Sequence, residues 1–168
     1  DTETKPQILP ELLRPGLVLA ALEKAATNVP TDISWGEWSA ESVVKAQAKG
    51  MPVLVDFTAD WCAPCKHIEK TAINVPSVRK KLAQFNVVTL KADFTDKSKV
   101  IENEMHRFGR PGPPLVLLYP PKEPAKPIVM PQEFTSIDLL KALDQAVGEK
   151  AGTQKGLEST EASATPRR

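Results

Sequence analysis

Short apolar runs recur along the chain at the length of a buried β-strand. The clearest run is Val53–Thr58, which is apolar apart from Asp56 and the terminal threonine. A run of this kind predicts a strand in the interior of a sheet. The other predicted strands are 33–35 at an edge, 87–92, 115–119, and 128–130 as the hairpin partner of 115–119.

Segments with apolar residues at helical spacing alternate with these strands. Ser39 suits the N-cap of the first helix, which Gly50 should end, and Pro76 suits the first turn of a later one. The predicted helices cover residues 40–49, 62–73, 76–85, 97–108 and 136–147. The order β-α-β-α-β-α-β-β-α favours an α/β fold in which a mixed central sheet is flanked by helices.

A length of 168 residues fits one domain with tails. We expect the domain to cover residues 32–148, after a leader or linker (1–31) and before a disordered tail (149–168) that is polar and rich in small residues. A short helix is predicted at 17–26, and its apolar part is far shorter than a membrane span. The polar start suggests a soluble domain cut from a larger or membrane-anchored protein.

Charge and cysteine content narrow the function. The 22 Lys and Arg balance 21 Asp and Glu and are scattered, which argues against a nucleic-acid surface or a basic membrane patch. The only two cysteines, Cys62 and Cys65, would close too short a loop to stabilise the fold much. A reactive role is therefore favoured.

Both cysteines lie where the strand 53–58 gives way to a helix. A Cys-x-x-Cys pair at such a junction is typical of a dithiol redox site. Unpaired amide groups and the dipole at the helix N-terminus would stabilise a Cys62 thiolate, which makes Cys62 the attacking residue. Cys65, one turn further on, is placed to resolve the mixed disulfide. A pair of buried structural cysteines is the alternative interpretation.

Two carboxylates are candidates for controlling the protonation of the cysteine sulfurs. Asp56 interrupts a buried strand, where burial should raise its pKa, and it is a candidate for moving a proton to or from Cys65. Glu69 follows Cys65 by one helical turn and is a second candidate. The alternatives are a solvated edge-strand position for Asp56 and a solvated helix position for Glu69.

Residues around the cysteines are expected to contact a substrate chain. Pro64 stiffens the loop between the cysteines, and we expect a reducing rather than a strongly oxidising potential. Pro114, directly before the strand 115–119, is a candidate cis-proline, with a trans polyproline turn as the alternative. Trp61 would add an apolar contact surface unless it belongs to the core. The expected substrate-binding set is Trp61, Ala63, Pro64, Pro113 and Pro114.

The two histidines raise the question of a metal. His67 and His106 do not provide, together with Cys62 and Cys65, the paired ligand spacing of a zinc site. We expect no metal, and no cofactor apart from a redox-active Cys62–Cys65 disulfide.

The segment Val53–Lys66, Val-Leu-Val-Asp-Phe-Thr-Ala-Asp-Trp-Cys-Ala-Pro-Cys-Lys, is similar to the active-site segment of thioredoxins. The resemblance covers roughly residues 33–147 and implies the thioredoxin fold. Within that superfamily, the chain most resembles the C-terminal periplasmic domain of transmembrane thiol–disulfide interchange proteins of the DsbD type. The resemblance lies in residues 57–62 followed by Lys66, Glu69 and Lys70.

The resemblance also implies roles for individual residues. Cys62 would be the nucleophile and Cys65 the resolving cysteine, with Asp56 and Glu69 as acids that tune them and Pro114 as the cis-proline. Domains of this type take electrons from a membrane-embedded dithiol and pass them to acceptors outside the cytoplasm.

The leading hypothesis is therefore a protein-disulfide reductase of the periplasm. We expect it to be a monomer whose partners are protein thiols and disulfides, with a membrane-embedded donor domain among them. A free-standing thioredoxin-like reductase for a dedicated client, such as an apocytochrome, is the first alternative. A peptide-binding or chaperone module that kept the fold is the second.

Overall fold

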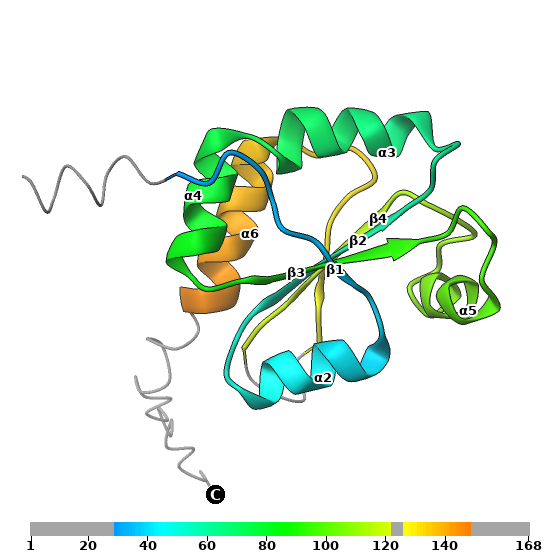
Figure 1. The fold of residues 1–168 in the computed structure, drawn as a ribbon, viewed down its shortest axis with the longest axis horizontal. Helices are drawn as coiled ribbons and strands as arrows, with labels where there is room; N and C mark the ends of the chain where they lie inside the picture. Colours follow the sequence, from blue (N-terminus) through cyan, green and yellow to red (C-terminus); the bar gives the residue numbers. More distant parts are fainter. Residues whose placement is uncertain (1–28, 122–125, 149–168) are drawn as a thin grey trace, which may run out of the picture.

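The computed structural model describes residues 29–121 and 126–148. The predicted helix at 17–26, the tail at 149–168 and all but the last residues of the leader 1–31 lie outside this part of the chain. The described residues form an α/β sandwich around one sheet (Figure 1). None of their helices has both the length and the hydrophobicity that a membrane span requires.

The sheet is mixed, as predicted. Its strands are β1 (Gly36–Glu37), β2 (Val53–Thr58), β3 (Val88–Asp93), β4 (Leu115–Tyr119) and β5 (Ile128–Val129), in the spatial order β1-β3-β2-β4-β5. β1, β3 and β2 run parallel, whereas β4 is antiparallel to β2 and β5 is antiparallel to β4. β2 is thus the central strand, and all six of its residues are buried.

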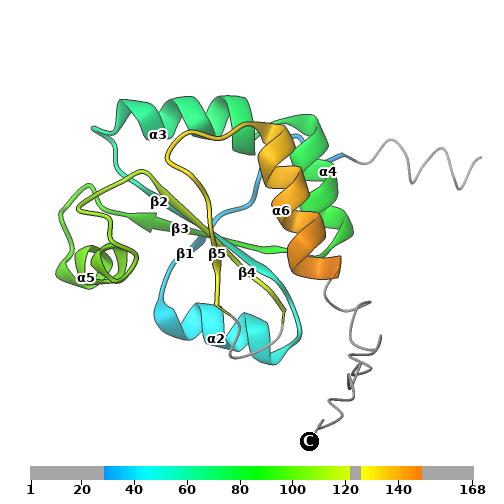
Figure 2. The same cartoon turned by 180° about the vertical axis from the view of Figure 1, so that it is seen from behind.

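Two helices, α2 (Ala40–Ala48) and α5 (Lys99–Arg107), cover one face of the sheet (Figures 1 and 2). Alternate residues of β2 point to this face. The core there includes Val53, Val55 and Phe57 of β2, Val43 of α2 and Met105 of α5. The N-terminus of α2 is capped as predicted, because the Ser39 hydroxyl accepts a 3.0 Å hydrogen bond from the Ser42 amide.

The opposite face carries a layer of helical segments: α3 (Ala63–Ile68), the π-helical turn η2 (Glu69–Ile73), α4 (Pro76–Gln84) and α6 (Ser136–Gly148) (Figure 2). Leu54 of β2 lies in the core cluster under this layer, with Ile73 and Leu143. Because side chains alternate along a strand, Asp56 shares the face of Leu54. A carboxyl group therefore faces the helical segments that follow the cysteines.

Two local features differ from the sequence prediction. The edge strand lies at Gly36–Glu37 instead of 33–35. Trp35 packs against the core cluster under the helical layer, and the bare Cα of Gly36 lets the chain approach β3, where a Cβ would lie 3.2 Å from Leu90 Cδ2. The segment 62–73 is not α-helical throughout, since the Asn74 amide donates to the carbonyl of Glu69 and closes a π turn.

The two sides of α6 should respond differently to truncation. Leu143 is fully buried, and Leu143→Ala should lower the free energy of unfolding by about 2–5 kcal/mol because it leaves a cavity. Ile137 on the same helix is 60% exposed, and Ile137→Ala should change stability by less than about 1 kcal/mol. Urea denaturation of both variants measures the difference, and equal losses would contradict this packing.

Candidate active site

The two cysteines are joined at the start of α3. Cys62 occupies the N-cap position and forms a disulfide with Cys65, with the two Cα atoms 5.3 Å apart. The Cys65 amide donates a 3.3 Å hydrogen bond to Cys62 Sγ. This is the kind of helix-terminal donor that also stabilises a thiolate at the same sulfur. Both cysteines are buried.

The residues next to the disulfide form an exposed rim. Ala63 and Pro64 are exposed, and Pro64 lies in the first helical turn, where its missing N–H costs no hydrogen bond. Trp61 is 55% exposed, so the core interpretation of this residue is wrong. Its ring packs edge-on against Phe94 with the centroids 6.2 Å apart, and Nε1–H donates to the Thr95 carbonyl.

The Gly-Pro-Pro loop reaches the same end of the sheet. The Pro113–Pro114 peptide bond is cis, and both prolines are half-buried. Leu115 follows directly and pairs with Phe57 near the end of β2. From that end the chain continues to Cys62, and Leu115 shares a core cluster with both cysteines.

Asp56 is the buried carboxyl that the sequence predicted. It is 3% exposed, and its Oδ2 atom has no hydrogen-bond partner. Burial, with a smaller contribution from the charge of Glu69, raises its pKa to about 7 against the opposing charge of Lys91. The alternative of a solvated edge strand is wrong, because β2 is the central strand.

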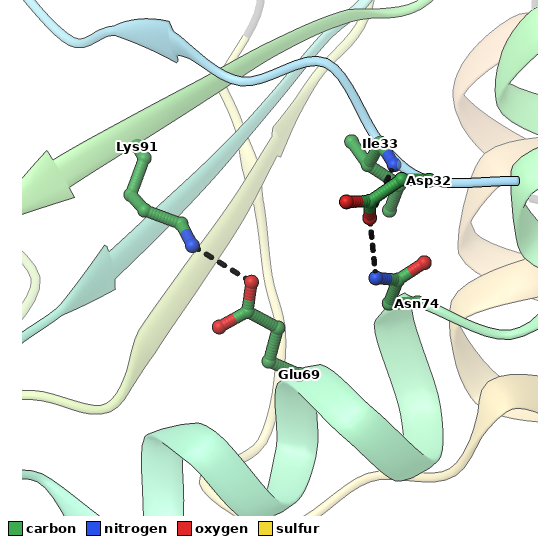
Figure 3. Close-up of polar contacts among 5 residues, drawn as sticks. All are labelled: Asp32, Ile33, Glu69, Asn74 and Lys91. Atoms are coloured by element: carbon green, nitrogen blue, oxygen red, sulfur yellow. Dashed lines mark hydrogen bonds and ion pairs between the residues drawn. The ribbon is translucent and has the colours of Figure 1, made fainter.

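Glu69 lies in η2 and points toward the sheet (Figure 3). Its Oε1 accepts a 2.7 Å hydrogen bond from the Nζ of Lys91 in an ion pair, and both side chains are half-buried. Glu69 is therefore not a fully solvated helix residue. Lys91 pairs in register with Asp56 across β2 and β3, so Glu69 and Asp56 face the same cation.

Lys91 is the charged residue that sequence reasoning missed. It belongs to the predicted strand 87–92, and a lysine inside a mostly apolar strand was the available signal. Its ammonium also lies over the ring of Trp35, 5.0 Å from the centroid. His67 and His106 are exposed, and residues 29–121 and 126–148 contain no cluster of His, Cys, Asp or Glu that fits a metal ion.

A family model described as thioredoxin-like matches residues 34–121, just over half of the chain. The chain belongs to the thioredoxin-like family. Its solved structural neighbours share the fold: a thioredoxin from Thermus thermophilus superposes with a TM-score of 0.55 at 22% identity, covering 74% of this chain and all of that one. The reduced C-terminal domain of Neisseria meningitidis DsbD gives a TM-score of 0.51 at 19% identity, covering 65% of this chain and 97% of that domain. The predicted thioredoxin fold is confirmed.

Curated proteins similar to this chain include several named thiol:disulfide interchange protein DsbD. The one from Ralstonia nicotianae is 33% identical over 108 residues, which make up 64% of this chain and 17% of that protein. A second, from Pseudomonas aeruginosa, is 32% identical over 80 residues, 48% of this chain and 13% of that protein. The match thus spans less than a fifth of the length of these relatives. A Cys-x-x-Cys disulfide in a thioredoxin-like domain is the arrangement of a thiol–disulfide oxidoreductase.

The buried carboxyl should make stability depend on pH. An acid whose pKa is about 7 in the folded protein and near 4 when unfolded binds its proton more tightly when folded. The contribution of this group to stability is therefore largest below pH 4 and falls by about 4 kcal/mol between pH 4 and 7. Asp56→Asn should remove this loss, which urea denaturation from pH 4 to 8 would measure.

Asp96→Asn is the matched control, because Asp96 is an exposed loop carboxyl. Its unfolding free energy should follow the wild-type pH dependence. If Asp56→Asn kept that dependence as well, the burial of an ionisable carboxyl at position 56 would not govern it.

Proposed function

We propose that this chain is an extracytoplasmic protein-disulfide reductase that works through Cys62 and Cys65. The observation that carries the proposal is the arrangement of the disulfide at the start of α3 and the buried Asp56 carboxyl on the strand that leads to it. The first group exchanges disulfides, and the second can exchange a proton near neutral pH.

Reduction of a substrate proceeds in two exchanges. The Cys62 thiolate attacks one sulfur of the substrate disulfide, forms a mixed disulfide and releases the other substrate sulfur as a thiolate. Cys65 then loses its proton and attacks Cys62 Sγ, which closes the Cys62–Cys65 disulfide and releases the second substrate thiolate. Two electrons pass to the substrate, and the disulfide seen in the structure is the product.

Asp56 is proposed to accept the Cys65 proton during the second exchange. Its pKa of about 7 allows it to take up and release a proton at neutral pH. Glu69 acts on this step through charge, because its carboxylate raises the pKa of Asp56. Support for the coupling comes from the face of the sheet that Asp56 and Glu69 share beneath the helical layer.

The substrate chain is proposed to lie across the exposed rim. Trp61, Ala63 and Pro64 offer an apolar surface beside the sulfurs. Pro113 and Pro114, directly before the start of β4, would border the substrate on the other side. An extended peptide can hydrogen-bond to backbone at such a position.

The partners proposed are protein dithiols and disulfides outside the cytoplasm, with a membrane-embedded dithiol as electron donor and the domain itself a monomer. Similarity to proteins named thiol:disulfide interchange protein supports this assignment over a chaperone module without redox chemistry. No cofactor beyond the Cys62–Cys65 disulfide is needed for the two exchanges.

Cys65→Ser should trap the partners. Without the resolving thiol, the mixed disulfide at Cys62 persists, so the variant expressed in its native host should carry covalently bound proteins that dithiothreitol releases. Mass spectrometry identifies them, and a membrane donor and periplasmic acceptors are expected. A single dedicated client would instead support the free-standing reductase.

Cys62→Ser is the control for that experiment. It lacks the attacking sulfur, so it should trap no partner and lose at least about 1000-fold in insulin reduction. Retained insulin reduction by Cys62→Ser would refute the nucleophile assignment.

Asp56→Asn should change the pH dependence of exchange. The asparagine cannot accept the Cys65 proton, so release of the mixed disulfide should slow about 10- to 100-fold at pH 7, and the inflection near pH 7 should vanish. Stopped-flow measurement of mixed-disulfide resolution from pH 5 to 9 tests this. An unchanged profile would argue against Asp56 as the proton acceptor.

A further inference from the structure

The buried carboxyl of Asp56 lacks a partner although a lysine lies on the neighbouring strand. Asp56 and Lys91 are paired in register across β2 and β3, and both side chains point to the face under the helical layer. Yet Asp56 Oδ2 has no hydrogen-bond partner. The ammonium group is therefore drawn elsewhere.

Two groups hold the Lys91 ammonium. Glu69 accepts from Nζ at 2.7 Å (Figure 3), and the Trp35 ring lies 5.0 Å from the same nitrogen. An indole face attracts a cation through its quadrupole. Trp35 precedes β1, the edge strand that pairs with β3 on the side away from β2, so this attraction draws the cation away from Asp56.

The segment that carries Trp35 is itself fixed to the domain. Its Ser34 carbonyl accepts a 2.6 Å hydrogen bond from the Thr89 hydroxyl of β3. Nearby, Asp32 accepts a 2.7 Å hydrogen bond from the Asn74 side chain, directly after η2 (Figure 3), and Arg79 of α4 donates to the Pro30 carbonyl at 2.6 Å. These contacts hold the backbone before Trp35 against the domain, and the indole itself packs on the core cluster under the helical layer.

We propose that Trp35 is a positioning residue for thiol–disulfide exchange: together with Glu69 it holds the Lys91 ammonium away from Asp56 and so keeps that carboxyl without a counterion. A buried carboxyl without a counterion keeps its proton to a higher pH than one that is paired with a lysine. The consequence for catalysis rests on the proposed function, in which Asp56 carries the Cys65 proton.

Few other charges act on this arrangement. The charged groups that act on Asp56 are Glu69 of η2 and Lys91 of β3. On its other side, the residue of β4 in register with Asp56 is the apolar Val116. Three further carboxylates lie around Lys91. Glu37 of β1 is in register with it, and the charge of Lys91 lowers the pKa values of Asp93, at the end of β3, and of Asp32, in the N-terminal segment.

Trp35 is the uncharged residue among those around Lys91, so replacing it neither adds nor removes a charge.

Trp35→Leu tests the proposal directly. Removing the ring frees the ammonium to move toward Asp56, so the pKa of Asp56 should fall by about 1. The carboxyl carbon of Asp56, followed by NMR in the oxidised protein from pH 4 to 9, reports this titration without any activity assay. Lys91→Met should shift the same titration in the opposite direction, because it removes the cation altogether.

The double variant separates the proposed cause from solvent entry. In the Lys91→Met background, Trp35→Leu has no ammonium to release and should leave the Asp56 titration in place. A decrease of the same size in that background would mean that water, not the lysine, lowers the pKa, and the proposal would be wrong. An unchanged or raised pKa in Trp35→Leu alone would also overturn it.

Trp35→Phe covers the case in which the leucine variant does not fold. Its smaller ring attracts the cation less strongly, so it should lower the pKa in the same direction by less; no decrease would count against the proposal. The rate profile tests the proposed function separately. If the Asp56 titration moves in Trp35→Leu while the pH dependence of mixed-disulfide resolution does not, the positioning stands and Asp56 is not the proton acceptor.

Discussion

A carboxyl group buried at the centre of the sheet is the constraint on which the rest of the site depends. Asp56 lies on the central strand, almost without exposure and with one oxygen unpartnered. A buried ionisable group is tolerated only if it is neutral or has an opposite charge nearby. Lys91 on β3 lies in register with Asp56, but its ammonium is ion-paired with Glu69 of η2. The protonation of Asp56 therefore depends on contacts among β2, β3 and η2.

Much of this could be predicted from the sequence, because the decisive signals are local. The apolar run around Asp56 predicted both a buried strand and a raised pKa, since burial follows from strand alternation and the pKa follows from burial. The position of the Cys-x-x-Cys pair at the start of a helix could be predicted, because the pattern of a buried strand changes to a helical pattern at the cysteines. The Ser39 cap follows from the same kind of short-range chemistry.

The parts that could not be predicted depend on contacts between residues far apart in the chain. Glu69 and Lys91 are 22 positions apart, and only the packing of η2 on β3 brings them together. The π turn has no composition signal, because the residues Glu69–Ile73 suit an α-helix equally well. The shift of the edge strand to Gly36–Glu37 likewise depends on where Trp35 finds its packing partners.

The capping position of Cys62 has a consequence for how partners distinguish the two redox forms. Two of the hydrogen bonds that fix the backbone around the cysteines involve no sulfur: the Cys62 amide donates to the Ala59 carbonyl, and the Lys66 amide donates to the Cys62 carbonyl. Because neither of these bonds depends on the disulfide, we expect the start of α3 to stay in place when the disulfide opens. A partner that distinguishes the two forms would then respond to the charge and reactivity of the two sulfur atoms rather than to the course of the backbone.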